Sequence, residues 1–142
     1  MTLPEWFDYD RWANRCWYHS LTANGRDQEW QIFRHLLSAQ KVWLLRTLGE
    51  QPTQMPVIED AAAELEDLHD RWHTTLFANR HNPVVHYHRL NGDPGVLAFD
   101  HIAQHVINHG SYHRGEIRGL YLARGCDDFP ETDLILFLAT DH

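Results

Sequence analysis

Apolar residues recur at helical spacing along most of this chain, in four long stretches separated by turn-forming residues. The stretches run from about Thr2 to Ala23, from Asp27 to Leu48, from Ile58 to Asn79, and from the region Pro94–Val96 to Arg124. They predict an all-α fold, an up-and-down four-helix bundle that forms a single domain over residues 1–142.

Two shorter stretches depart from this pattern. The apolar row within Asp133–Ala139 fits a short helix or a buried strand, and we favour a short C-terminal helix packed on the body. Helical spacing is also lost over His81–Gly95, where Val84–Leu90 fits an extended segment before the turn signal Asn91-Gly92. A lone strand has no partner, so we expect at most a small hairpin there, with Asp93 capping the last long helix.

Charge and composition exclude several classes of protein. The chain has 12 Lys and Arg against 20 Asp and Glu, a net charge of −8, whereas nucleic-acid binders usually carry a basic excess. No apolar run approaches the roughly 18–20 residues of a membrane span, and the first residues lack the pattern of a secretion signal. Cys16 and Cys126 form no CxxC pair, so we expect no disulfide framework, idle thiols and a cytoplasmic location.

The 12 histidines raise the question of a metal site, and two of them are placed to form one. His109 and His113 are four residues apart, and Ile102 and Leu120 mark the centre of their helix's apolar face, with Arg114 on the far side. At about 100° per residue both histidines fall near that centre, where an unpartnered polar ring costs roughly 1–3 kcal/mol. An HxxxH pair on one helix face can chelate a divalent ion, and two hydrogen-bonded core histidines are the alternative.

Three further residues are candidates around this pair. His35 shares its helix face with apolar residues, so it is either a third ligand or an interior histidine with a hydrogen-bond partner. His105 lies farther from the apolar centre and is expected at the rim, and Asn14, off the centre of its own apolar face, is either a residue that contacts the ligands or a surface or flank residue. His105 and Asn14 are therefore candidates for contacts to the ligands rather than for ligands themselves.

Two other motifs fit a metal site less well. Glu66 and His69 form an ExxH element of the kind used by di-iron bundles, but only one convincing copy is present and both residues are expected to face solvent. His86 and His88 could chelate from a strand, but we expect them in a solvated loop.

The motifs also resemble a known family. The segment Gln104–Ile117 strongly resembles the C-terminal helix signature of the DinB/YfiT-like metalloenzyme family. The segments Arg11–Arg15, Arg34–Leu44, Tyr87–Gly92 and Glu131–Leu134 look like weaker motifs of the same family, and they occur in the right order. The resemblance covers nearly the whole chain.

The resemblance implies a four-helix bundle, commonly a homodimer, that holds one divalent metal ion by three histidines. Carried over residue by residue, these ligands are His35, His109 and His113. The sequence does not name the metal, because imidazole suits zinc, nickel and iron alike. The family often has Gln three residues after the last ligand, whereas this chain has Glu116, which could orient a ligand or approach the metal.

Three neutral histidines with open positions are typical of a catalytic metal site rather than a closed structural one. Relatives in the family include thiol-dependent S-transferases and metal-dependent hydrolases or isomerases. The resemblance therefore implies a metal-dependent enzyme that activates a low-molecular-weight thiol, or water, against a small electrophile; the sequence assigns no other catalytic residue. The alternatives are a non-catalytic metal-binding protein and a purely structural or stress-response dimer.

Overall fold

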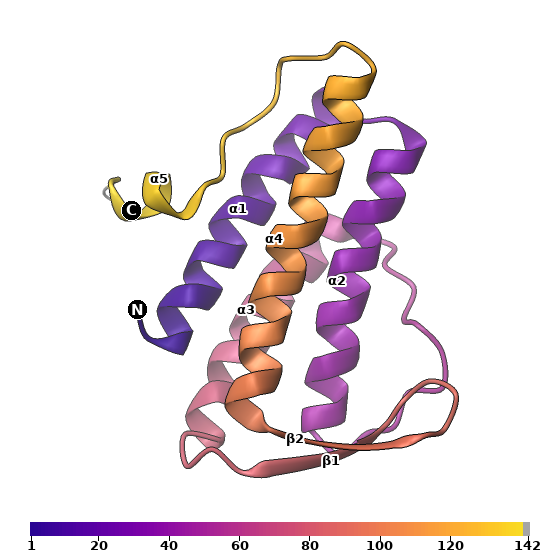
Figure 1. Ribbon diagram of the computed structural model, residues 1–142, viewed down its shortest axis with the longest axis vertical. Helices are drawn as coiled ribbons and strands as arrows, with labels where there is room; N and C mark the ends of the chain where they lie inside the picture. The colour runs from indigo at the N-terminus through magenta and orange to yellow at the C-terminus, as the bar shows by residue number, and fades with distance from the viewer. Residues whose placement is uncertain (141–142) are drawn as a thin grey trace.

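The computed structural model describes residues 1–140, which are mostly helical. Four long helices pack together (Figure 1). A two-stranded hairpin connects the third helix to the fourth, and a short helix follows the fourth. The elements are α1 (Leu3–Asn24), α2 (Asp27–Thr47), α3 (Ala61–Ala78), β1 (Val84–His88), β2 (Pro94–Ala98), α4 (Phe99–Ala123) and α5 (Leu134–Leu138). The predicted helical bundle, small hairpin and short C-terminal helix are confirmed. None of the helices within residues 1–140 is long and apolar enough to cross a membrane.

Two hydrogen bonds between Thr2 and Glu5 stabilise the first turn of α1. The Thr2 hydroxyl accepts a hydrogen bond from the Glu5 backbone N–H, and the Glu5 carboxylate accepts one from the Thr2 N–H at 2.7 Å. This capping box satisfies two backbone donors that a helix start otherwise leaves open. Asp60 caps α3 through a single hydrogen bond, in which its carboxylate accepts from the Ala63 N–H.

The last long helix starts later than the sequence pattern suggests. Pro94–Ala98 is a strand that pairs antiparallel with Val84–His88, so α4 begins at Phe99 and the prediction of a start near residues 94–96 is wrong. Gly95 allows the pairing, because a Cβ at that position would collide with the ring of Tyr87.

The helices follow an up, down, down, up path, so the prediction of a simple up-and-down bundle is wrong in this respect (Figure 1). Near the end of α2, Trp43 packs on Tyr87 of β1 with ring centroids 5.0 Å apart, and the end of α3 leads directly into the same hairpin. Both helices therefore end at the hairpin and run in the same direction. The linker of residues 48–60 returns along α2, where the Ser38 hydroxyl donates to the Pro56 carbonyl at 2.6 Å.

The core is built largely from aromatic side chains. Trp72 of α3 is fully buried between Phe7 and Phe99, with ring centroids 4.9 and 6.4 Å away. One apolar stripe of α3 is buried along its whole length, at Ala61, Leu65, Leu68, Trp72 and Leu76. Large aromatic rings bury much apolar area each, which suits a small bundle.

A charged group also lies inside the bundle. Arg114 of α4 is 2% exposed, and its Nη1 donates to Asp10 Oδ1 and Asn14 Oδ1, both at 2.8 Å. A Cβ at Gly110 would stand 2.8 Å from the same Asp10 oxygen, so the glycine makes room for this pair. The prediction that Arg114 points away from the apolar face is wrong, because its partners on α1 compensate its charge inside the core.

Candidate metal centre

The histidines of α4 lie at the edge of its buried face rather than at its centre. The centre is occupied by Gly110, Arg114 and Ile117, which are buried, whereas His109 and His113 are only partly buried. At about 100° per residue His109 and His113 are rotated from Gly110 by roughly 100° and 60°, in the same direction. The predicted position in the middle of the core stripe is therefore corrected to a position on its flank.

His35 of α2 approaches this flank from the neighbouring helix. Its ring centroid lies 5.4 Å from that of His109 and 4.7 Å from that of His113, and the last two are 4.4 Å apart. One ring nitrogen from each residue falls within 4.8 Å of the others. The structure thus brings the three predicted ligands together, although His35 is exposed and not interior as expected.

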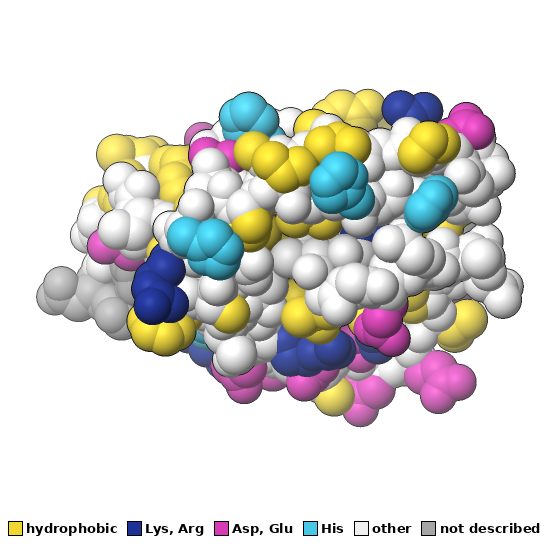
Figure 2. All heavy atoms as spheres, turned by 90° about the horizontal axis from the view of Figure 1, so that it is seen from below, with side chains coloured by type: hydrophobic (Ala, Val, Ile, Leu, Met, Phe, Trp, Pro, Cys, Tyr) yellow, Lys and Arg dark blue, Asp and Glu magenta, His cyan; other side chains and the backbone are white. Residues whose placement is uncertain are grey.

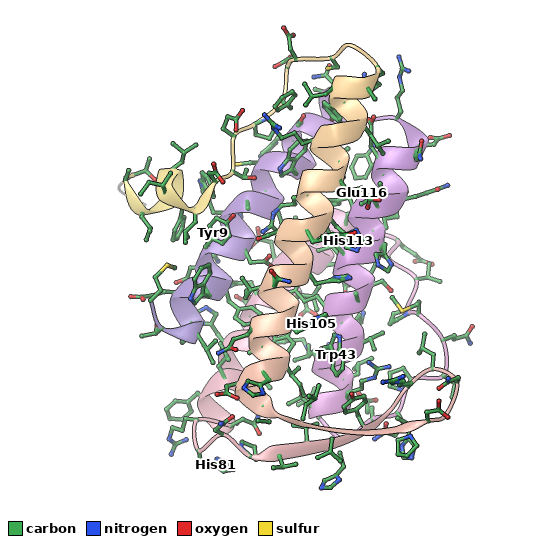
Figure 3. All side chains as sticks on the ribbon, in the orientation of Figure 1. Tyr9, Trp43, His81, His105, His113 and Glu116 are labelled. Atoms are coloured by element: carbon green, nitrogen blue, oxygen red, sulfur yellow. The ribbon has the colours of Figure 1, made fainter. Side chains whose placement is uncertain are left out.

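The hydrogen bonds of His113 orient its ring toward the centre of the cluster. Glu116, one turn further along α4, has Oε1 2.9 Å from His113 Nδ1, and Figure 3 shows the two residues on adjacent turns of the helix. When neutral His113 donates the Nδ1 proton to this carboxylate, the Nε2 lone pair is free and faces His109 Nε2 at 3.1 Å. A carboxylate behind a ligating imidazole is a common arrangement in metal sites.

Burial keeps two of the rings in the neutral form that a metal ligand needs. Partial burial, followed by the nearby His113, His105 and His35, lowers the pKa of His109 to about 4. Partial desolvation, which affects even the exposed His35, and the neighbouring His113 also lower the pKa of His35, against a weaker opposing effect of Glu116. Both imidazoles are therefore unprotonated at neutral pH.

The donor atoms fit a divalent transition-metal ion. Zinc binds imidazole nitrogen at about 2.0–2.1 Å, which places two nitrogens on one ion about 2.9–3.4 Å apart for coordination angles between octahedral and tetrahedral. The 3.1 Å separation of the His109 and His113 nitrogens lies in this range. Because His35 is exposed, its side chain can adjust without disturbing the core.

The remaining predicted site residues are divided between this cluster and the core. His105 packs on His109 with ring centroids 5.4 Å apart and on Trp43 at 5.7 Å, so it flanks the cluster toward the hairpin (Figure 3). Asn14 is 2% exposed, and its amide group is bonded to Asp10 and Arg114. The surface or flank alternative for Asn14 is therefore wrong, because the buried Arg114 needs a polar partner there.

A hollow of about 260 Å³ lies beside His35, between α2 and the linker that returns along it. Arg34, His35 and Ser38 line one side, and the linker residues Met55–Ile58 line the other. The hollow places mixed polar and apolar surface next to the exposed histidine.

The sequence reasoning missed a second cluster, formed by Asp8 of α1 with His69 and His73 of α3. His69 is 9% exposed, so the prediction that it faces solvent is wrong, while Glu66 pairs with Arg15 at 2.7 Å. The missed signal is the spacing of His69 and His73, which are four residues apart in sequence and so lie on one face of the helix, next to the buried Trp72.

His86 and His88 lie on β1 rather than in a loop, and both are exposed as expected. Figure 2 views the hairpin end of the molecule and shows its histidine side chains spread apart over the surface. Cys16 and Cys126 are free thiols, and burial raises the pKa of Cys16. A raised pKa leaves less reactive thiolate at neutral pH, in line with the expectation of an idle thiol.

The lowered pKa of His109 predicts how the stability of the metal-free protein depends on pH. Unfolded His109 binds a proton below its ordinary pKa of 6.5, whereas folded His109 binds one only near 4. The free energy of unfolding should therefore fall as the pH drops from 6.5 toward 4, by about 1 kcal/mol after allowance for solvent exposure. Urea denaturation of wild type and His109→Gln at several pH values measures this pH dependence. The same change in the free energy of unfolding with pH in both proteins would contradict the prediction.

Comparison of the chain with protein-family models, curated proteins and solved structures found no match. What the structure supports is a mainly helical protein with a cluster of three histidines that could hold a metal ion.

Proposed function

We propose that this protein binds one divalent metal ion through His35, His109 and His113 and uses it to activate a low-molecular-weight thiol for transfer to a small electrophile. The observation that carries the proposal is the convergence of three imidazole nitrogens from two helices to within 4.8 Å of one another. The resemblance of the sequence motifs to DinB/YfiT-like metalloenzymes supports the same ligands. Water instead of a thiol would give a hydrolase with the same site.

A metal ion held by three neutral histidines keeps open positions and lowers the pKa of a thiol or water bound there. The side chains of this chain contribute in other ways. His109 and His35 stay neutral because their pKa values are lowered, and Glu116 holds the proton of His113 on Nδ1. Arg34, which lines the hollow beside His35, offers a positive charge for an anionic substituent of the thiol or the electrophile.

The exposed position of His35 favours an open, reactive site over a buried structural one. A structural metal holds the fold together, whereas here His35, His109 and His113 lie outside the cluster of buried apolar side chains that forms the core. We include in the proposal a homodimer, which the resemblance implies and which exposed Ile135, Leu136 and Leu138 on α5 would suit.

The experiment begins with elemental analysis of purified protein whose affinity tag has been removed, followed by chelation. A catalytic metal leaves a folded but inactive apoprotein, measured by circular dichroism and by a screen of thiols with electrophiles. Turnover that is lost on chelation and restored by one metal ion supports the proposal. Unfolding on chelation would assign the metal a structural role, and thiol turnover unaffected by chelation would reject the mechanism.

His35→Ala should lower the metal affinity at least about tenfold without unfolding the protein, because an exposed side chain contributes little to the core. The pair His109 and His113 remains on one rigid helix and still chelates weakly. Calorimetric titration with zinc measures the change. Unaltered affinity and stoichiometry would remove His35 from the ligand set.

Glu116→Gln should weaken metal binding about tenfold, because an amide is a weaker acceptor for the His113 Nδ1 proton than a carboxylate. Glu5→Gln is a distant control, since Glu5 lies in the capping box of α1. A loss of affinity of about 100-fold or more would instead indicate that Glu116 is itself a ligand.

A further inference from the structure

The second cluster lies between α1 and α3 and shares no residue with the three-histidine site between α2 and α4. Asp8 Oδ1 is 2.7 Å from His69 Nε2 and 3.0 Å from His73 Nε2. The two imidazole rings are 4.3 Å apart, and the three donor atoms lie within 4.8 Å of one another. Two imidazoles and one carboxylate therefore converge on a single point.

The fold brings these residues together through the aromatic core. His69 and His73 are four residues apart, so they share one face of α3 beside the fully buried Trp72. Phe7 stacks on Trp72 at 4.9 Å, and the next residue along α1 is Asp8. The stack thus fixes the spacing of the carboxylate and the two imidazoles.

We propose that Asp8, His69 and His73 bind a second divalent ion of the first transition series, such as Zn²⁺ or Fe²⁺. A set of two histidines and one carboxylate suits these ions, whereas Mg²⁺ and Ca²⁺ prefer oxygen ligands. The Asp8 and His73 side chains are 38% and 33% exposed, so an ion can reach them from solvent. Three protein ligands also leave open positions, and His73 lines a hollow of about 550 Å³ that could admit a further small ligand.

Two groups beside His69 favour opposite states of the site. Arg11 Nη1 lies 3.2 Å from His69 Nδ1, and it donates a hydrogen bond only when that nitrogen carries no proton. Asp70 Oδ1 lies 3.3 Å from the same nitrogen and accepts its proton when Nε2 binds a metal. Arg11 therefore favours the metal-free hydrogen-bonded cluster, and Asp70 favours the metal-bound one.

The test is a zinc titration of tag-free protein, monitored by calorimetry and by circular dichroism. Wild type should bind two zinc ions per chain and His73→Ala one. The double variant His109→Ala, His113→Ala lacks the three-histidine site and should still bind one ion, which is lost when His73→Ala is added. The exposed His86→Ala serves as a control and should leave the stoichiometry unchanged.

The failure of this proposal is distinct from the failure of the three-histidine site. A folded double variant that binds no zinc, or binds it equally well after His73→Ala, would overturn the second site. If the double variant does not fold, equal stoichiometry of wild type and His73→Ala has the same meaning. As an independent readout, Arg11→Gln should tighten and Asp70→Asn should weaken zinc binding, each at least about threefold; no change in either would speak against a metal-bound His69.

Discussion

Asp10→Ala should lower the free energy of unfolding by about 3–5 kcal/mol, because it leaves the Arg114 guanidinium buried without its ionic partner. Asp10 and Arg114 are 3% and 2% exposed, so water cannot replace the lost carboxylate. Asn14 still accepts one hydrogen bond from Arg114 but brings no negative charge. Urea denaturation followed by circular dichroism measures the effect at neutral pH.

Two variants control for this result. Asp10→Ala combined with Arg114→Met should recover most of the lost stability, because an apolar replacement of a buried ion pair is often close to neutral. Arg118→Ala, one turn further along α4, should cost at most about 1 kcal/mol, since the exposed Arg118 makes only weak contacts with Glu131 at 3.9 Å and with the Phe129 ring at 5.0 Å. A loss below about 1 kcal/mol for Asp10→Ala would contradict the assigned role of the pair.

The helices could be predicted because each contains its own signals. Apolar residues at helical spacing predicted a helix from about Thr2 to Ala23 and another from Ile58 to Asn79, close to the observed α1 and α3. The convergence of three histidines was predicted as well, from the spacing of His109 and His113 together with the family resemblance.

What could not be predicted depends on partners far along the chain. The spacing of apolar residues predicts a surface position for Arg114. Its burial is possible only because Asp10, on another helix, compensates its charge. For the same reason the centre of the buried face of α4 was predicted at the wrong position, and His109 and His113 were predicted to be more deeply buried than they are. Pro94 fits a helix start as well as a strand, and the pairing with His88 in β1 decided between them.

The path of the chain was equally undetermined by local pattern. The linker of residues 48–60 is compatible with an α3 that runs antiparallel or parallel to α2. Contacts at the hairpin end show that the two helices are parallel. This path places α3 beside α1 and so creates the cluster of Asp8, His69 and His73. The sequence of α3 alone, in which His69 follows Glu66 and Asp67, does not show that Asp8 of α1 lies next to His69.

His109→Ala should lower the affinity of the three-histidine site for zinc at least about 100-fold, a larger effect than the loss of His35. Its removal leaves His35 and His113 on different helices, whereas the loss of His35 leaves a chelating pair on one helix. His109 is also the ring whose nitrogen lies 3.1 Å from that of His113, at a separation that suits a common ion. Zinc competition with a chromophoric chelator measures the affinity.

His105→Ala is the matched control, one turn earlier on the same helix. Its ring lies 5.4 Å from that of His109, but its nitrogens are outside the cluster of three, so its removal should change zinc affinity by less than about threefold. Because His105 contributes to the lowered pKa of His109, its loss should also make His109 slightly more basic without removing a ligand. Equal losses from His105→Ala and His109→Ala would mean that α4 holds the ion at a different point, closer to the hairpin, and that His35 is not its partner.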